Sequence, residues 1–153
     1  MKKITLRKSD IRDVNKKIED TYGVEDFFSK KDKIELVDED IILHNDIPAF
    51  FYHEGKISPT LKLLLKHEFP IKKVTVDMGA VKFVVSGADI MRPGITDFGK
   101  DIEKDDLVAI VDQNNHKPMA IGQMLFSGAE AEAMTSGKVV KSVHYVGDAL
   151  WTQ

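Results

Sequence analysis

The sequence contains no cysteine among its 153 residues, which excludes disulfide bonds and thiolate metal sites. It also has no run of the roughly 18 apolar residues that a membrane span requires. Its basic start, MKKITLRKSDIRD, is followed by no apolar stretch of the kind found in a signal peptide. We therefore expect a cytoplasmic protein that has no membrane partner.

Motifs for catalysis are missing as well. No histidine is paired with another at a metal-ligand spacing; the five are His44, His53, His67, His116 and His144. No serine lies in a nucleophile elbow, and there is no P-loop or dinucleotide-binding fingerprint. An acidic run from Asp97 to Asp106 lacks the glycine and glutamate spacing of a calcium loop, although cation binding there stays open at this stage. These absences predict that the chain is not an enzyme and holds no cofactor or metal ion.

Charge and glycine are distributed unevenly along the chain. Residues 1–73 hold 15 Lys and Arg against 14 Asp and Glu, whereas residues 74–153 hold 7 against 11 and contain 8 of the 10 glycines. A short break, EFPIKK, lies where the character changes. Because a chain of this length fits one domain or two small ones, the contrast predicts two domains, 1–73 and 74–153. The net charge of −3 alone does not argue for nucleic acid.

The first half reads as a mixed unit of helices and strands. Four apolar residues recur at helical spacing: Ile11, Val14, Ile18 and Tyr22. They predict a helix with Ser9 as its N-cap and Gly23 just beyond its last turn. Three strands are predicted next, at Lys33–Val37, Ile41–His44 and Ile47–His53. A second helix follows, with Ser58 as cap and Pro59 in its first turn.

The second half reads as a small barrel of short strands. Strands are predicted at Lys73–Asp77, Leu107–Val111, Met119–Phe126 and Val139–Val146, and a helix at Ala129–Met134 with Ser127 as its cap. The segment Met78–Ser86 is ambiguous. Its valines favour a strand, whereas the spacing of its apolar residues and the following Gly87 favour a helix.

Four segments of this half resemble those of the PUA domain, which is named for pseudouridine synthases and archaeosine transglycosylases. They are VTVDMGAVKFVVSGADIMRPGITDF, DDLVAIVD, PMAIGQMLFSGAE and HYVGDALW, and they cover Val74 to about Trp151. The first 73 residues are similar in size and element order to the pre-PUA domain of the malignant T-cell-amplified-sequence family of archaea and eukaryotes. Its eukaryotic members act on the small ribosomal subunit in translation initiation and recycling. The resemblance implies an α+β protein, in which an N-terminal α+β pre-PUA domain precedes a C-terminal PUA β-pseudo-barrel with short helices.

The resemblance also implies a helix before Gly87 and an RNA-binding surface around it. Carried over to this sequence, that surface comprises Gly79, Lys82, Phe83, Ser86, Gly87, Ala88, Met91, Arg92, Pro93, Gly94 and His144. Its cations, Lys82 and Arg92, could contact phosphates or base edges, or simply be solvated. The glycines could allow close approach of RNA or serve turn geometry alone.

Two features of the first half are candidates for further contacts. Lys8, Arg12 and Lys16 share one helix face and could contact RNA or a partner, or form a solvated face that nearby acids balance. In the strand Phe50–Tyr52, alternation places Phe51 opposite its two neighbours, so one side faces the core and the other could face a partner.

The sequence is thus interpreted as a non-enzymatic RNA-binding protein of the translation machinery. Its expected partners are structured RNA, either rRNA or tRNA, and the small ribosomal subunit or a translation factor. One alternative is an RNA-targeting accessory subunit of a tRNA- or rRNA-modifying enzyme. Another is a protein-interaction module that binds a translation factor through the first half.

Overall fold

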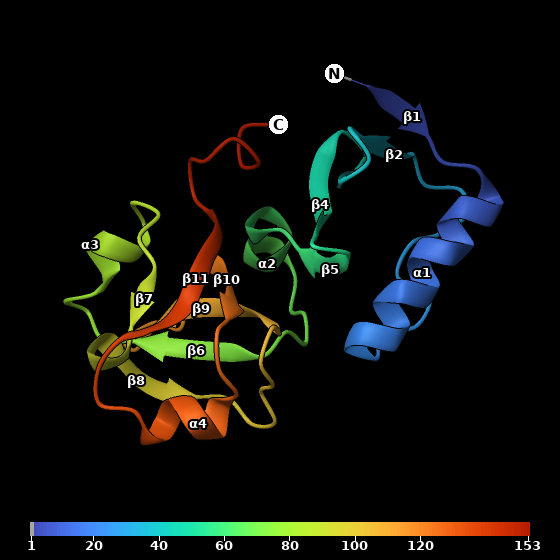
Figure 1. Ribbon diagram of the computed structural model, residues 1–153. Coiled ribbons are helices and arrows are strands. Elements are labelled where there is room, and N and C mark those ends of the chain that lie inside the picture. Colours follow the sequence, from blue (N-terminus) through green and yellow to red (C-terminus); the bar gives the residue numbers. More distant parts are fainter. Residues whose placement is uncertain (1) are drawn as a thin grey trace. The chain divides into compact units, whose positions relative to one another are not determined.

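The computed structural model describes residues 2–153 and is drawn as a ribbon in Figure 1. The chain forms two compact units, a first one that ends at Pro70 and a second one, Ile71–Thr152. The domain boundary that the sequence suggests, after Lys73, stays a prediction. The fold itself is the expected one, with an α+β unit followed by a small near-barrel.

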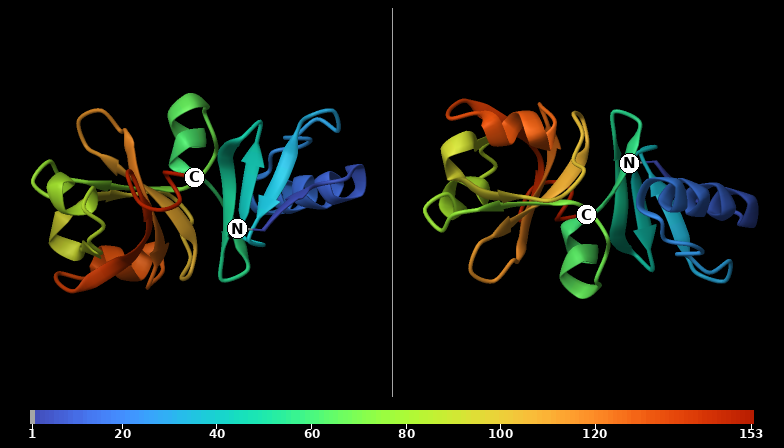
Figure 2. Two further views of the ribbon diagram at one scale, coloured as in Figure 1. Left: turned by 90° about the horizontal axis from the view of Figure 1, so that it is seen from above. Right: turned by 90° about the horizontal axis from the view of Figure 1, so that it is seen from below.

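The first unit is a five-stranded antiparallel sheet with two helices. Its elements are β1 (Lys3–Thr5), α1 (Lys8–Tyr22), β2 (Ile34–Val37), β3 (Ile41–His44), β4 (Ile47–His53), β5 (Lys56–Pro59) and α2 (Leu61–Lys66). The strands lie in sequence order, β1-β2-β3-β4-β5. The helix α1, blue in Figure 2, lies along one side of this sheet and buries Ile11, Val14 and Ile18. Its apolar spacing therefore predicted its buried face correctly.

Gly23 ends α1 as predicted, with a φ of +75°, but both predicted N-caps in this unit were wrong. The helix α1 begins at Lys8 because Asp10 accepts a hydrogen bond from the backbone N–H of Arg7, at 3.0 Å, which leaves Ser9 inside the helix. The helix α2 begins after Thr60, whose Oγ1 accepts from the N–H of Leu63 at 3.2 Å. Ser58 lies instead in β5, which adds a strand that the sequence did not predict.

Aromatic rings fill the core of the first unit. Neighbouring rings meet edge to face, with centroids 4.9–5.8 Å apart, in a cluster of Tyr22, Phe27, Phe28, Phe50 and Phe69. The loop that carries Phe27 and Phe28 is held by Asn15, whose side-chain amide exchanges two hydrogen bonds of 2.9 Å with the backbone of Phe28. The ring cluster thus connects the end of α1 (Tyr22) and the segment after α2 (Phe69) to the sheet through Phe50 of β4.

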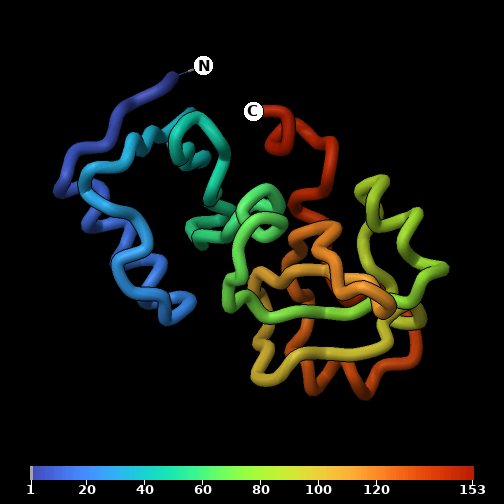
Figure 3. Tube along the Cα trace, turned by 180° about the vertical axis from the view of Figure 1, so that it is seen from behind, coloured from blue at the N-terminus to red at the C-terminus, as the bar shows by residue number. Residues whose placement is uncertain are grey.

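The second unit is a six-stranded mixed sheet that curls into a near-barrel. Its elements are β6 (Lys73–Val76), α3 (Val81–Val84), β7 (Ile90–Met91), the 3-10 turn η1 (Arg92–Gly94), β8 (Ile95–Phe98), β9 (Leu107–Asp112), β10 (Pro118–Met124), α4 (Gly128–Ala133) and β11 (Lys138–Tyr145). The strand order is β7-β11-β10-β9-β6-β8, and η1 joins the two edge strands. Figure 3 shows β6 (green) and β8 (yellow) side by side. Its core is aliphatic, built from valine, isoleucine, alanine and methionine side chains.

Strand pairing defines two ends of the near-barrel. At the α3 end, Val76 pairs with Asp112, and Ala120 pairs with Tyr145. At the other end, which we call the acidic-loop end, Gly99 donates a hydrogen bond to Lys73 O at 2.9 Å. Residues 99–106 lie there, and Met124 N donates to Asp106 O at 2.9 Å. Residues after β6 and residues after β9 therefore leave the sheet at the same end.

Candidate RNA interface on the second unit

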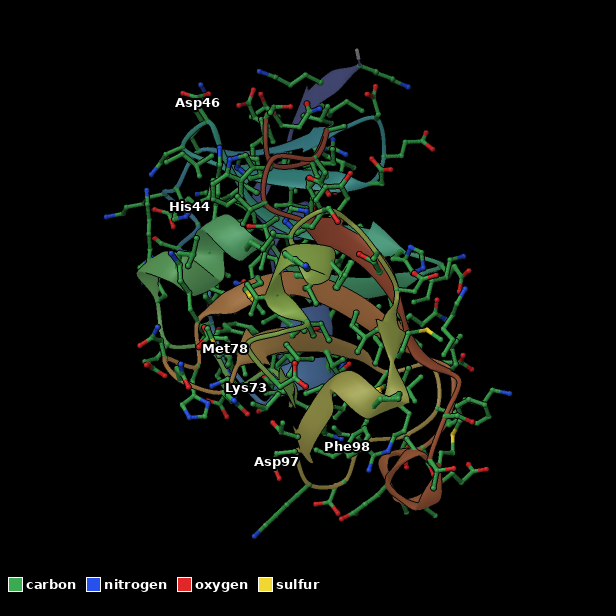
Figure 4. All side chains as sticks on the ribbon, turned by 90° about the vertical axis from the view of Figure 1, so that its left-hand side faces the viewer. His44, Asp46, Lys73, Met78, Asp97 and Phe98 are labelled. Carbon is green, nitrogen blue, oxygen red and sulfur yellow. The ribbon has the colours of Figure 1, made fainter. Side chains whose placement is uncertain are left out.

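The segment that follows β6 is a short helix, as the resemblance implied and against the β propensity of its valines. The turn before it is fixed by Asp77, whose Oδ1 accepts from Ala80 N at 2.8 Å and whose N–H donates to Gly94 O at 2.9 Å. Figure 1 shows the arrowhead of β6 on the side where α3 lies. Of the residues labelled in Figure 4, Lys73 is the first residue of β6 and Met78 follows the end of this strand. The position of α3 is thus set by hydrogen bonds to the strand end.

The end of α3 is a Schellman motif. Gly87 N donates to Val84 O at 3.1 Å, and Ala88 N donates to Phe83 O at 3.0 Å. Gly87 has a φ of +92°, and a Cβ built there would lie 2.7 Å from the ring of Tyr145. Both the backbone conformation and the close approach of β11 therefore require glycine at this position. Ser86 also serves this helix end, since its Oγ donates to Phe83 O at 2.8 Å.

Apolar side chains of this segment point into solvent. Phe83 is 56% exposed, and Met78 and Val85 are each exposed by more than 40%. The Nζ of Lys82 lies 5.1 Å from the centroid of the Phe83 ring. An exposed ring with an adjacent cation offers a stacking face for a base and a charge for a phosphate. Lys82 and Phe83 are the predicted site residues whose side chains are best placed for RNA.

The other predicted residues differ in how they relate to α3: Met91 lies away from it, whereas Gly79 and Gly94 lie beside the turn that precedes it. Met91 is 49% exposed, but it pairs with Lys138 at the start of β11, whereas Gly87 contacts Tyr145 at the end of that strand. Gly79 is exposed, and a Cβ there would approach only Asp77, at 3.4 Å, so space does not require glycine. Pro93 and Gly94 form η1, where Gly94 serves as an acceptor for Asp77.

Arg92 is occupied within the protein. Its guanidinium donates to three backbone carbonyls, those of Ala131 at 2.8 Å, Ile95 at 3.0 Å and Glu132 at 3.2 Å. It also lies 5.3 Å from the centroid of the Phe98 ring. The carbonyls of Ala131 and Glu132 belong to the last turn of α4, whose negative dipole end favours a cation. Arg92 therefore ties α4 to β8, and two of its five N–H donors are left for any RNA contact.

His144 is not at the surface. Its side chain is 1% exposed, and its Nδ1 lies 2.9 Å from Asp148 Oδ2. Burial lowers the pKa of His144, and the hydrogen bond and charge of Asp148 oppose this shift. Asp148 also accepts hydrogen bonds from the backbone N–H groups of Tyr145 and Trp151, each at 2.9 Å. The buried pair organises the turn after β11, so we leave His144 out of the proposed surface.

Two groups account for eight of the eleven acids of the second unit, and the others are Asp89, which pairs with Lys138, and Glu130 and Glu132 in α4. At the α3 end, Asp77, Asp112 and Asp148 all accept hydrogen bonds from backbone N–H groups. Those bonds lower the pKa of Asp112, with Asn115 N–H the leading cause. The predicted acidic run, Asp97, Asp101, Glu103, Asp105 and Asp106, continues from β8 into the acidic-loop end. Over residues 2–153, no group of three or more potential ligands could hold a metal ion.

The two candidate features of the first unit have different environments. Lys8, Arg12 and Lys16 are exposed on α1, where Lys16 Nζ forms a 3.2 Å ion pair with Asp20. In β4, both Phe50 and Phe51 are buried, the first within the ring cluster. His44, labelled with Asp46 in Figure 4, lies close to a carboxylate of the same unit: its Nε2 is 3.2 Å from Asp32 Oδ2.

One exposed loop at the α3 end was missed by the sequence reasoning. Residues Gln113–Lys117 join β9 to β10, and the sequence assigns them no functional role. All five residues are exposed and polar. The signal in the sequence is the run of amides after an aspartate, DQNNHK, which is typical of turns in general.

Comparison with known proteins gives the family. The model of the PUA domain matches residues 72–146, and that of a domain of unknown function, DUF1947, matches residues 2–67. A protein of Methanocaldococcus jannaschii is 40% identical over 98% of this chain and 95% of its own length. Malignant T-cell-amplified sequence 1 of Danio rerio is 33% identical, over 97% of this chain and 89% of the relative. The chain belongs to the malignant T-cell-amplified-sequence family.

Two further matches bear on this family's function and fold. Translation machinery-associated protein 20 of Saccharomyces cerevisiae is 37% identical over 88% of this chain and 79% of its own length. A hypothetical protein from Pyrococcus horikoshii has a TM-score of 0.82 at 32% identity, covering 99% of this chain and 98% of its own. These relationships support an RNA-binding, translation-related role. No helix within residues 2–153 is long and apolar enough to cross a membrane.

Proposed function

We propose that the protein is a non-enzymatic, cytoplasmic RNA-binding factor of translation that engages structured RNA, rRNA or tRNA, and works with the small ribosomal subunit. The supporting observation is the exposed pair Lys82 and Phe83 on the helix α3, which is held rigidly by its Schellman end. A base can stack on the Phe83 ring while Lys82 neutralises a phosphate.

The charge arrangement removes an objection to RNA binding by an acidic unit. Phosphate repulsion depends on local charge, and at the α3 end the cations Lys82 and Lys117 are exposed, whereas the carboxylates of Asp77 and Asp112 accept hydrogen bonds from backbone N–H groups. The acidic run lies toward the other end, where Lys72 lies 3.5 Å from Asp106. The net charge of the unit is therefore a poor guide to the field at α3.

A second reading has some structural support. The chain is similar, at 27% identity and a TM-score of 0.51, to part of an H/ACA ribonucleoprotein bound to a substrate RNA, covering 65% of this chain and 31% of the other. An accessory role in RNA modification would use the same face of α3. The third reading, a module that binds a translation factor through Phe50–Tyr52, is not favoured, because Phe50 and Phe51 are buried.

The test is binding of the full chain to tRNA and to small-subunit rRNA, measured by fluorescence anisotropy over a salt series. Replacing Phe83 with Ala should weaken binding roughly fivefold or more, as expected for a lost stacking contact. Lys82→Glu should weaken it and lower the salt slope by about 1. The matched control, Lys100→Glu, lies next to Gly99 at the acidic-loop end and should bind like the wild type.

Two outcomes would reject this proposal. One is a wild-type chain that binds neither RNA at low salt. The other is equal loss of affinity in all three variants, which would indicate non-specific attraction. To separate translation from RNA modification, tagged protein is captured from native extract with and without RNase; small-subunit particles support the first, and a modification enzyme with tRNA supports the second.

A further inference from the structure

The loop Gln113–Lys117 has a fixed backbone and uncommitted side chains. Asp112, which is buried, accepts hydrogen bonds from the N–H groups of Asn114, Asn115 and Lys117 at 3.0, 2.6 and 3.2 Å. His116 N donates to Asp112 O at 2.9 Å. Among residues 2–153, none forms a hydrogen bond or ion pair with a side chain of this loop. The loop therefore presents amide, imidazole and ammonium groups to solvent without the entropy cost of ordering its backbone.

His116 has a left-handed backbone conformation, with a φ of +54°. Glycine adopts this region at no cost, and histidine, like asparagine and aspartate, adopts it more often than most other residues. The turn that Asp112 fixes therefore accommodates a histidine, which is exposed. Glycine at this position would remove the imidazole and keep the turn.

The residues at both ends of the loop connect it to α3. Before it, Gln113 N donates to Val76 O at 3.0 Å, and the chain continues from Val76 into α3. After it, Ala120 pairs with Tyr145, whose ring lies against Gly87 at the end of α3. Neighbouring strands lie about 4.8 Å apart, so the loop and the helix share one rim of the near-barrel.

The geometry points to the loop Gln113–Lys117 as a second RNA contact that extends the α3 surface along this rim. The inference rests on the proposed function. Its side chains suit unpaired nucleotides: the amides and the imidazole can pair with base edges and 2′-hydroxyls, and Lys117 can neutralise a phosphate. RNA that stacks a base on Phe83 would place its adjoining nucleotides over this loop.

The test uses two variants of the full chain with the tRNA of the previous assay. His116→Gly removes the side chain and also relieves the positive φ, so its melting temperature should be equal or higher while RNA affinity falls about fivefold. Lys117→Glu should lower affinity and reduce the salt slope by about 1. In amide NMR spectra of labelled wild type, added RNA should shift the signals of residues 113–117 together with those of α3.

The outcomes distinguish this inference from the proposed function. If wild type binds RNA and Phe83→Ala weakens it, while His116→Gly and Lys117→Glu bind like Lys100→Glu, the loop contact is overturned and the α3 surface stands. If wild type binds no RNA, both fail. Signals that shift at α3 but not at residues 113–117 also overturn the loop contact.

Discussion

The two units of this chain differ in where they place phenylalanine. The first unit packs Phe27, Phe28, Phe50 and Phe69 edge to face in its core. The second unit packs Phe98 and Phe126 against an aliphatic core and leaves Phe83 more than half exposed. A large ring in solvent contributes little to folding, so its presence on a rigid helix indicates a use outside the fold.

The two units also differ in what their hydrogen-bonding side chains stabilise. Asn15 and Thr60 serve the first unit by fixing a loop and a helix start. In the second unit, Asp77 and Asp112 fix the backbone on either side of the α3 rim, where Lys82 and Lys117 stay exposed. The first unit thus shows mainly structural constraints, whereas the second combines them with a surface that is ready to bind.

The strongest test of this contrast is a pair of alanine substitutions. Phe50→Ala should lower the free energy of unfolding by about 3–5 kcal/mol, because it leaves a cavity within the ring cluster. Phe83→Ala should change it by less than about 0.5 kcal/mol, since the ring is exposed. Urea denaturation of both variants measures the difference. Similar losses in the two would show that Phe83 is part of a core, and the contrast would be abandoned.

Arg92 sharpens the comparison from within the second unit, because the sequence assigned it to RNA and the structure gives it a packing role. Arg92→Lys should lower the free energy of unfolding by about 1.5–3 kcal/mol, since lysine cannot reach three carbonyls at once. RNA affinity should change less than in Lys82→Glu, with the two compared at the same salt. If the Arg92→Lys variant kept full stability but lost RNA binding, Arg92 would belong to the RNA-binding surface after all.

Gly87→Ala tests the rigidity of the α3 end. We expect a loss of about 1–3 kcal/mol in the free energy of unfolding, because alanine at positive φ is strained and its Cβ would collide with Tyr145. Gly79→Ala is the control, since its φ is not positive and no atom lies closer than ordinary contact. Thermal melts of the two variants measure the effect. Equal melting temperatures would contradict the close approach.

The sequence predicted well the elements that have a clear apolar period, and poorly the features that tertiary contacts decide. The buried face of α1 and the span of β4 followed from apolar spacing and β propensity alone. Gly23 after α1 and Ser127 before α4 were predicted correctly as caps. The predicted N-caps of α1 and α2 were wrong because several residues near each helix start could serve, and tertiary contacts decide between them. Thr60, for example, also donates to Pro48 O in β4, at 2.7 Å. The α3 segment needed a family resemblance, because its valines favour a strand while its apolar spacing and Gly87 favour a helix, and the two local signals do not decide between them.

The same reasoning explains the limits for the candidate site. Lys82 and Phe83 were found because the family motif contains them. The roles of Arg92 and His144 could not be read from sequence, since their partners are backbone carbonyls of α4 and a carboxylate in the final turn. Nor could the position of the loop Gln113–Lys117 beside α3 be read from sequence, since it follows from the parallel pairing of β6 with β9 and the pairing of β10 with β11.

The smallest expected effect is a pH dependence of stability that the second unit shows because of His144. Burial lowers the pKa of His144 in the folded chain below its ordinary value of 6.5. As the pH falls below that value, the unfolded chain takes up a proton that the folded chain resists, so the stability of the second unit should decline until the folded pKa is passed. Fluorescence of Trp151, the one tryptophan, monitors urea unfolding of this unit from pH 7.5 downwards. His144→Gln should flatten the decline, whereas His67→Gln in the first unit should not; an unchanged decline in His144→Gln would place the titrating group elsewhere.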